Sequence, residues 1–438
     1  MTAAPDTGGT PTSHQTDWSQ LALICFASFI VWAGFGAILP YLPVFLHEQA
    51  HAPVWMIGVI AAMYYAGTFV FSSPLGRLSD RIGRKPVVVA GLFLYALATF
   101  LFVTTVNASW FLLFRLCEGV GAASVGPAGS ALIADLSDED TRGRAYGFLT
   151  SAQFGGLVLG PALAVGLNDL GGGGRRGFYA IFLVGSAMTL AMALLVLVLL
   201  KEPAHTAARR HEAAGERPSY RSLITPPIFA FLLIAAASHF AMGGWEVLWS
   251  LWLRHLGASM AFVSLTWIAF SVPMLFSFAG GMLAEKGNRF RLMFGGYAFS
   301  AASWIVYGFT RNLALFLAFN VFEGIAVAIS MPAKQAFLVQ CSPRRWLGTV
   351  QGMEQTSMQL SALVGTLTAP LLFTWISGYA IGVGGFLALG GLAGAAPILS
   401  REWKRIAAGG EPLSLAEAER LAPPARGAAF DDERAPLL

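Results

Sequence analysis

GRLSDRIGRK, residues 76–85, is the stretch of sequence that decides the fold, and it separates two apolar segments of the chain. It carries two glycines, one acidic residue and four basic residues. Gly76 permits close approach of helices, Asp80 can interact with a helix N-terminus or an arginine, and the basic side chains can anchor at the inner leaflet of a membrane. Membrane anchoring alone explains the basic residues but not Asp80 and the two glycines.

Apolar segments recur on both sides of this stretch along the whole chain. Of the 438 residues, 56% are apolar and 12% are charged, and the mean hydropathy is +0.63, which excludes an ordinary soluble domain. A helix of roughly 20 apolar residues crosses a bilayer core about 30 Å thick. Runs such as residues 190–200 lack the alternation that a membrane β-barrel requires. The sequence therefore predicts an all-α integral membrane protein with twelve transmembrane helices: 21–46, 55–75, 86–106, 110–133, 145–167, 178–200, 228–253, 261–283, 292–309, 313–339, 347–376 and 381–399.

Lysine and arginine are concentrated in alternate loops between these segments. With the N-terminus inside, the outer loops hold only Arg175, Arg176, Arg254 and Arg311. The positive-inside rule then places both termini in the cytoplasm of a multi-pass protein, which we expect in the plasma (inner) membrane. The first apolar segment has no basic flank or cleavage site, so we expect it to be a retained span and not a secretory signal.

The excess of basic residues does not indicate a nucleic-acid partner. The formal net charge is +4 and the pI is about 9.0, but no Lys/Arg-rich run occurs. Cys25, Cys117 and Cys341 have no C-x-x-C spacing, so neither disulfides nor a metal site is expected. The sequence contains no phosphate-binding loop and no Ser-His-Asp arrangement, which argues against ATP-driven pumping and against an enzyme. No cofactor is expected, and the energy has to come from an ion gradient or from the solute's own gradient.

The chain contains an internal repeat. A shift of 205 residues superimposes glycines, acidic residues and prolines of its two halves: Gly76 on Gly281, Asp80 on Glu285, Glu118 on Glu323, Gly119 on Gly324, Pro127 on Pro332 and Gly160 on Gly365. It is unexpected by chance that both an acidic residue followed by glycine and a separate proline match at the same offset. Parallel repeats of six spans place a substrate at the interface of the halves near mid-bilayer and support rocking alternating access.

This repeat divides the chain into five parts. We expect a cytoplasmic N-terminal tail (1–20), a six-helix bundle (21–200), a cytoplasmic linker (201–226), a second six-helix bundle (227–400) and a cytoplasmic C-terminal tail (401–438). Within the tail, residues 413–421 can form a short surface helix, and residues 433–438 resemble an acidic dileucine sorting signal. A monomer is expected.

The stretch 76–85 resembles in full the G-x-x-x-D-R-x-G-R-K loop of the major facilitator superfamily. In that family the loop is thought to latch the two halves in the outward-facing state, and the acidic residue matters most. The resemblance implies this latch role for the segment's matching residues: Gly76, Asp80, Arg81, Gly83 and Arg84. It also implies the fold of the family, twelve transmembrane helices in two pseudo-symmetric six-helix halves.

Two further elements resemble the twelve-span drug:proton antiporters of this superfamily. GFGAILPYLP, residues 34–43, is similar to their first-span pattern, although the acidic residue that many relatives carry in this span is absent. A fifth-span element with the pattern G-x8-G-x3-G-P is matched by Gly147, Gly156, Gly160 and Pro161. Such a helix is tightly packed and bendable. Ala164 and Val165 replace the next two glycines of the family pattern.

Ionisable residues inside the expected spans are candidate functional residues, because a charge in the bilayer centre costs roughly 2.5 to 3.5 kcal/mol. FRLCEGVGAA, residues 114–123, resembles the family's fourth-span element, with Glu118 in place of the usual glutamine. The family implicates the arginine, here Arg115, in proton coupling. Being three residues apart, Arg115 and Glu118 can also be no more than an ion pair on one helix face. Glu323, near mid-bilayer, is the best single candidate for a titrating or cation-binding carboxylate.

The remaining candidates each allow a functional and a structural interpretation. Glu246 lies among tryptophans and either lines an aromatic outer vestibule for cations or snorkels beside an interfacial tryptophan belt. His239 either shuttles protons or packs through a hydrogen bond. Residues toward the inner ends of their spans are expected to form inner-gate ion pairs: Asp135, Lys334 and Glu354.

Together these observations predict a secondary active transporter, a proton-coupled antiporter that exports small amphipathic or cationic compounds in the manner of multidrug efflux. Its partners would be a small-molecule substrate, protons and the lipid bilayer. Two alternatives remain: an importer or facilitator of a nutrient, sugar or lipid on the same fold, and a membrane receptor or scaffold that does not transport. The fifth-span element favours export, and the cost of burying Glu118 and Glu323 argues against a scaffold.

Overall fold

The computed structural model describes residues 17–137, 141–201, 223–343 and 346–410. Within these ranges the chain is helical and contains no strand: α1 (Trp18–Ile38), α2 (Leu42–Glu48), α3 (Val54–Ile82), α4 (Arg84–Leu101), α5 (Ala108–Leu136), α6 (Arg142–Leu170), α7 (Gly174–Leu199), α9 (Pro226–His255), α10 (Met260–Ser271), the 3₁₀ segment η2 (Val272–Phe276), α11 (Ser277–Lys286), α12 (Arg289–Phe309), α13 (Leu313–Gln340), α14 (Leu347–Ile376) and α15 (Tyr379–Ala407). In the described ranges, twelve helical units are long and apolar enough to cross a membrane, which confirms the predicted number. Most of the predicted linker, the surface helix at 413–421 and the sorting signal at 433–438 lie outside the described residues.

Proline and glycine determine where the helices break. The first predicted span is divided into α1 and α2 at residues 39–41, because Pro40 has no N–H to continue the helix, while Pro43 fits in the first turn of α2. Pro273 similarly lies in η2, between α10 and α11. The stretch 76–85, expected to be a loop, is mostly helical: α3 continues to Ile82 and α4 starts at Arg84. The turn between them is Gly83, whose φ of 109° favours glycine.

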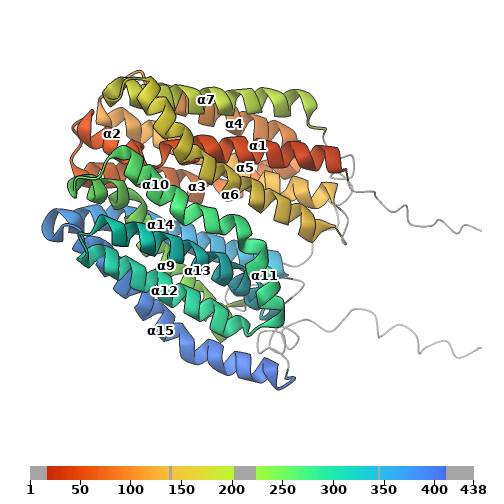
Figure 1. Ribbon diagram of the computed structural model, residues 1–438. Helices are drawn as coiled ribbons and strands as arrows, with labels where there is room; N and C mark the ends of the chain where they lie inside the picture. Colours follow the sequence, from red (N-terminus) through yellow and green to blue (C-terminus); the bar gives the residue numbers. More distant parts are fainter. Residues whose placement is uncertain (1–16, 138–140, 202–222, 344–345, 411–438) are drawn as a thin grey trace, which may run out of the picture.

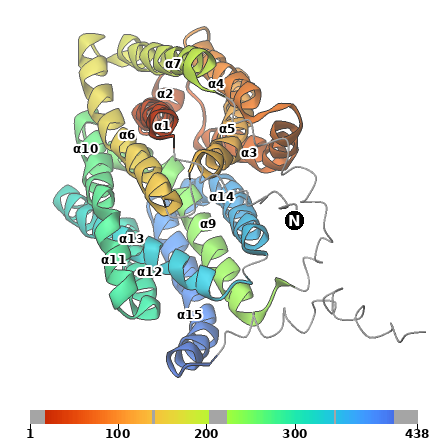
Figure 2. The ribbon, with the colours of Figure 1, turned by 90° about the vertical axis from the view of Figure 1, so that its right-hand side faces the viewer.

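The helices form two bundles, α1 to α7 and α9 to α15, which lie side by side (Figure 1). We call the end at which the described chain begins and finishes the terminal end; it lies at the right in Figure 1. The opposite, distal end carries the connections at residues 49–53, 102–107, 171–173, 256–259, 310–312 and 377–378. Seen from the terminal end, α3 lies beside α14 and α6 lies beside α10 (Figure 2). Under the 205-residue shift α3 corresponds to α10 and α6 to α14, so the two contacts are pseudo-symmetric copies of each other.

Glycines at the shared offset make the same close contacts in both bundles. Gly119 on α5 packs against a carbonyl oxygen of α3, and its counterpart Gly324 on α13 packs against one of α10. Gly160 joins α6 to α1 in the same way, as Gly365 joins α14 to α9. A methyl group at any of these positions would overlap the facing backbone. The repeat in the sequence is therefore a repeat of helix packing.

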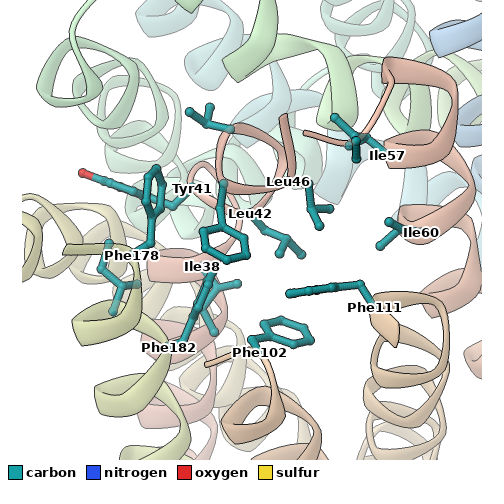
Figure 3. Packing of buried hydrophobic residues seen from close by; sticks show 14 of the residues in the cluster. Ile38, Tyr41, Leu42, Leu46, Ile57, Ile60, Phe102, Phe111, Phe178 and Phe182 are labelled. Atoms are coloured by element: carbon teal, nitrogen blue, oxygen red, sulfur yellow. The ribbon is translucent and has the colours of Figure 1, made fainter. Parts of the chain in front are cut away.

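An apolar core fills the distal part of the first bundle (Figure 3). Phe102 packs against Phe111 and Phe182 with ring centroids 5.1 and 5.3 Å apart, and Phe45 of α2 meets Phe182 edge to face at 5.2 Å. Aromatic pairs at such distances add to the stabilisation from burial alone. This core holds α1, α2 and α3 in position beside the second bundle.

Candidate functional site

A small cavity lies between the two bundles, and part of its wall is formed by residues of the apolar core of Figure 3, among them Ile38, Leu42 and Ile57. Its wall is mostly apolar and comes from α1, α2 and α3, with contributions from α5 and α9: Phe35, Ile38, Leu39, Leu42, Pro43, Leu46, Ile57, Ile60, Ala61, Arg115, Glu246 and Val247. Two charged residues, Arg115 and Glu246, therefore face one apolar space from opposite bundles. Mostly apolar pockets with a few placed polar groups are typical binding sites for small molecules.

Arg115 and Glu118 form an ion pair inside the first bundle. The guanidinium Nη1 lies 2.8 Å from Glu118 Oε2, and the hydroxyl of Thr99 donates to Glu118 Oε1 at 2.6 Å. The guanidinium also stacks over the Tyr64 ring, 4.7 Å from its centroid. Glu118 is 0% exposed and does not line the cavity. Its carboxylate instead positions the guanidinium of Arg115, which is part of the cavity wall.

Glu246 accepts a hydrogen bond from the opposite bundle. The Tyr65 hydroxyl of α3 donates to Glu246 Oε2 at 2.5 Å, and Arg115 is close enough to interact electrostatically with the same carboxylate. The neighbouring Trp245 and Trp249 are buried within the second bundle, and the Trp249 indole donates to Thr266 at 2.9 Å. The structure therefore rules out the alternative of an interfacial tryptophan belt, because these rings face protein and not lipid.

Glu323 is enclosed in the second bundle. Its carboxylate accepts a hydrogen bond of 2.9 Å from the Tyr307 hydroxyl, and it is only 2% exposed. Tyr307 in turn packs against Trp249 and Phe316, with centroids 4.8 and 5.4 Å away. In this conformation Glu323 does not reach the cavity, so direct contact with a substrate there is excluded.

A separate charged group lies nearer the terminal end of the second bundle. Lys334 Nζ of α13 is 2.5 Å from Glu354 Oε1 of α14, and both side chains are buried. His239 of α9 bonds through Nδ1 to the Ala235 carbonyl at 3.0 Å and interacts electrostatically with Lys334. The structure thus brings His239, Lys334 and Glu354 together. The side chain of Asp135 lies outside the described part of the structure.

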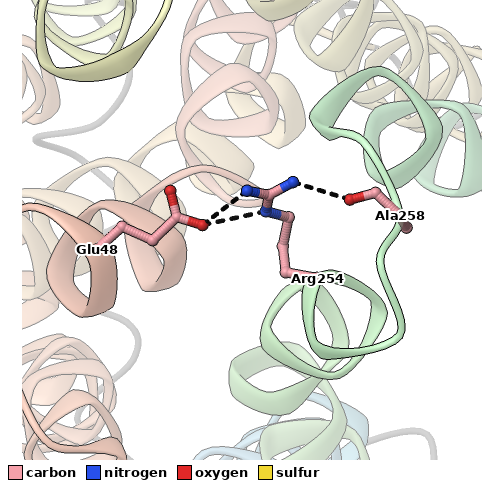
Figure 4. Close-up of polar contacts among 3 residues, drawn as sticks. All are labelled: Glu48, Arg254 and Ala258. Atoms are coloured by element: carbon pink, nitrogen blue, oxygen red, sulfur yellow. Dashed lines mark hydrogen bonds and ion pairs between the residues drawn. The ribbon is translucent and has the colours of Figure 1, made fainter.

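Two polar contacts join the bundles at the distal end. Arg254 at the end of α9 donates to Glu48 Oε1 through Nε and Nη2, at 3.1 and 2.9 Å, and also to the Ala258 carbonyl (Figure 4). Deeper in the same region, the Ser264 hydroxyl of α10 bonds to the Tyr41 hydroxyl at 3.4 Å. We call these two contacts and the Tyr65–Glu246 bond the distal seam.

The elements matched to family motifs are placed as follows. Gly76 is within α3, and Arg81 and Arg84 flank the turn at Gly83, while the side chain of Asp80 lies outside the described part. In the fifth-span element, Gly156 and Gly160 press α6 against α1. At Gly147, a methyl group added to the glycine would have no atom of the described residues within 4 Å. Pro161 is inside α6.

Sequence reasoning did not identify Tyr65, Thr99, Tyr307 or the Glu48–Arg254 pair. The hydroxyls of Tyr65, Thr99 and Tyr307 are hydrogen-bonding partners of candidate carboxylates, and a hydroxyl within an apolar span gives no distinctive sequence pattern. The Glu48–Arg254 pair lies at the ends of two spans. Only the pair of adjacent tyrosines at positions 64 and 65, within an otherwise apolar span, offered a signal.

Comparison with known proteins identifies the family of the chain. Residues 24–269, more than half of the chain, match the family model of the Major Facilitator Superfamily. Multidrug resistance protein 2 of Bacillus subtilis (strain 168) is 26% identical over 396 residues, which cover 86% of this chain and 93% of that protein. Multidrug resistance protein 1 of the same organism is 27% identical over 235 residues, covering 54% of this chain and 58% of that protein. Quinolone resistance protein NorA of Staphylococcus aureus is 24% identical over 237 residues, covering 53% of this chain and 58% of that protein.

Solved structures show the same fold. The bacterial homologue of the human lysosomal transporter Spinster, in an inward-facing and unoccupied conformation, has a TM-score of 0.67 at 16% identity, covering 93% of this chain and 98% of that one. The human organic anion transporter MFSD10 has a TM-score of 0.63 at 17% identity, covering 86% of this chain and 99% of that one. With its repeat of six spans, twelve spanning helices and the family match, the chain belongs to the major facilitator superfamily of membrane transporters.

Proposed function

We propose that this transporter exports small, amphipathic, cationic compounds in exchange for protons. The observation that carries the proposal is Glu246, a carboxylate in the wall of a cavity between the two bundles. Among the described residues no lysine or arginine forms an ion pair with it, because the neighbouring Arg115 pairs with Glu118. A carboxylate of this kind attracts a cation when ionised and releases it when protonated.

The charge count around the cavity supports a cationic substrate. Arg115 and Glu118 neutralise each other, which leaves the single negative charge of Glu246. One proton or one cationic group balances that charge, so proton and substrate compete for one site. An anionic substrate is disfavoured, because among the described residues of the cavity wall the only charge without an ion-pair partner is the negative charge of Glu246. The apolar remainder of the wall suits an amphipathic molecule.

The relatives and the charge distribution support the direction of transport. Two relatives carry the printed name multidrug resistance protein and a third is named for quinolone resistance, which supports export of small organic compounds. The excess of basic residues at the terminal end supports a cytoplasmic location of both termini in a plasma membrane. The seam at the distal end would then make this conformation inward-facing. Arg115, Glu118, Glu323 and His239 remain candidates for a role in proton coupling.

Flux into proteoliposomes with an imposed pH gradient tests the proposal, with ethidium and tetraphenylphosphonium as probes and glucose as a neutral comparison. We expect both cations to accumulate against proton flow. Glu246→Gln should weaken cation binding by about 2 kcal/mol, roughly 30-fold in Kd, and abolish pH-driven accumulation. Glu285→Gln, which removes an exposed carboxylate of α11, is the matched control and should behave as the parent.

Other outcomes would select the alternatives. Downhill flux that is insensitive to the pH gradient would identify a facilitator. No flux and no binding of any compound would favour a receptor or scaffold. If Glu246→Gln bound and accumulated both cations as well as the parent does, Glu246 would lose its assigned role.

A further inference from the structure

The bond between Tyr65 and Glu246 differs from the other contacts of the distal seam. The Tyr41–Ser264 contact joins two neutral hydroxyls, and the Glu48–Arg254 pair is about one third exposed at the end of the bundle. The Tyr65 hydroxyl instead bonds to a carboxylate that lines the cavity. The carboxylate of Glu246 therefore has two roles. It forms one of the contacts that close the seam, and it is the proposed binding group for proton and substrate.

An exchanger has a requirement that this arrangement can meet. It must change sides when it carries either of its two loads, and it must not change sides when empty, because empty return would allow net flux without exchange. Some contact must therefore hold the empty state and weaken when either load binds. Hydrogen bonds to ionised groups are about twice as strong as bonds between neutral groups, so protonation or a bound cation weakens a bond of this kind.

We infer that Tyr65 is the positioning residue that makes exchange obligatory, by holding the distal seam closed while Glu246 is empty and ionised. A substrate cation competes with the Tyr65 hydroxyl for the carboxylate oxygens, and a proton on the carboxylate removes its charge. Either load loosens the seam and allows the distal end to open. This inference rests on the proposed exchange at Glu246 and adds to it the residue that prevents leak.

The charged and titratable groups facing Glu246 leave Tyr65 as its direct partner. From α3, Tyr64 and Tyr65 face it, and from α5 Arg115 faces it, already paired with Glu118. On α9 itself, His239 is seven residues away, about 10 Å along the helix, and belongs with Lys334 of α13 and Glu354 of α14 to the group nearer the terminal end. Among the described residues of the other elements packed against α9, which are α2, α10, α13, α14 and α15, no titratable group interacts with Glu246.

The transport test compares Tyr65→Phe with Tyr41→Phe in proteoliposomes loaded with ethidium. Tyr41→Phe also removes a hydroxyl contact of the seam but does not touch a carboxylate, so it is the matched control. The parent and Tyr41→Phe should release ethidium only in exchange for external protons or external cation. Tyr65→Phe should still bind ethidium but release it down its own gradient without exchange, at least about tenfold faster than the parent. Strict exchange by Tyr65→Phe at the parent rate would overturn the inference.

A conformational measurement checks the same point without transport. Spin labels at Thr104→Cys and Arg311→Cys, exposed at the distal end of opposite bundles, report its opening in a background from which Cys25, Cys117 and Cys341 are removed. The parent distance distribution should shift toward longer distances as the pH falls, whereas Tyr65→Phe should already be shifted at neutral pH and should respond less. Glu48→Gln controls for the exposed ion pair and should keep the pH response.

The two tests separate failure of this inference from failure of the proposed function. If the parent shows no pH-driven accumulation, the exchange mechanism itself fails. If the parent exchanges and Tyr65→Phe keeps both strict exchange and the full pH response of the labels, only the role of Tyr65 fails.

Discussion

Three buried carboxylates of this transporter have different surroundings, and each surrounding suggests a different use. Glu118 is paired with Arg115 within one bundle, Glu246 bonds to Tyr65 across the two bundles, and Glu323 bonds to Tyr307 inside the second bundle. Although Glu118 and Glu323 are equivalent in the sequence repeat, only Glu118 has a basic partner. The repeat therefore preserves the position of a carboxylate but not its charge balance.

Glu323 provides a prediction that separates proton transfer from substrate binding. Because its carboxylate is enclosed by Tyr307 and away from the cavity, Glu323→Gln should change the Kd for ethidium by less than about twofold. If Glu323 passes protons, the same variant should lose pH-driven accumulation while remaining folded. Equilibrium binding and flux on one preparation measure both properties. Loss of ethidium binding would contradict the geometry, and unchanged accumulation would remove Glu323 from the proton path.

At the level of single residues, the sequence predicts groups near one another in the chain better than partners far apart. The Arg115–Glu118 pair follows from helical spacing alone. The positions of Lys334 and Glu354 toward the inner ends of their spans predict ion pairs, and the structure pairs these two residues with each other. Their role in an inner gate stays a prediction. Tyr65 and Glu246 are 181 residues apart and on different bundles, so no local pattern relates them.

At the level of elements, hydropathy predicts the spans and fails at their interruptions. The twelve segments are confirmed, but the divisions of the first span near Pro40 and of the eighth near Pro273 were not predicted. A helix interrupted by proline has the same composition as a continuous one, so a window average does not detect the break. The position of the stretch 76–85 between two spans and its resemblance to the family loop predict a loop, yet α3 continues as far as Ile82.

The fifth-span glycines provide a prediction with an internal control. At Gly160 an added methyl carbon would lie 2.6 Å from Ala37 N, so Gly160→Ala must push α6 away from α1 and should cost about 1 to 3 kcal/mol. At Gly147 the added methyl group meets no atom of the described residues within 4 Å, so the same substitution should be neutral or stabilising, because alanine favours a helix by about 1 kcal/mol over glycine. Thermal unfolding in detergent should therefore show a lower Tm for Gly160→Ala and no decrease for Gly147→Ala. Equal shifts for both variants would show that α1 and α6 do not pack as described.

At the level of the whole molecule, the repeat predicts which helices face each other but not which end is closed. Pseudo-symmetry relates the α3–α14 contact to the α6–α10 contact, so this pair of contacts does not by itself distinguish one end of the molecule from the other. The state itself depends on small differences between contacts at the two ends. The hydrogen bonds of the distal seam join the two bundles, so this conformation is closed at the distal end.

Gly58 should decide whether the distal end can close. It lies on α3 where α14 crosses, and a methyl carbon there would overlap the Thr366 carbonyl oxygen and approach Pro370 Cγ to 2.5 Å. Gly58→Ala should therefore disfavour the closed distal end by about 1 to 3 kcal/mol and shift the population toward an open one. The label pair at positions 104 and 311 should report longer distances at every pH while the response to pH is kept. Tyr65→Phe, in contrast, should lengthen the distances at neutral pH and reduce the response to pH. Gly166→Ala on α6 is the control, because no atom of the described part of the chain lies within 4 Å of the added methyl group, and it should leave the distances unchanged. Unchanged distances in Gly58→Ala would mean that the α3–α14 contact does not limit closure, and the seam would then depend on its polar contacts alone.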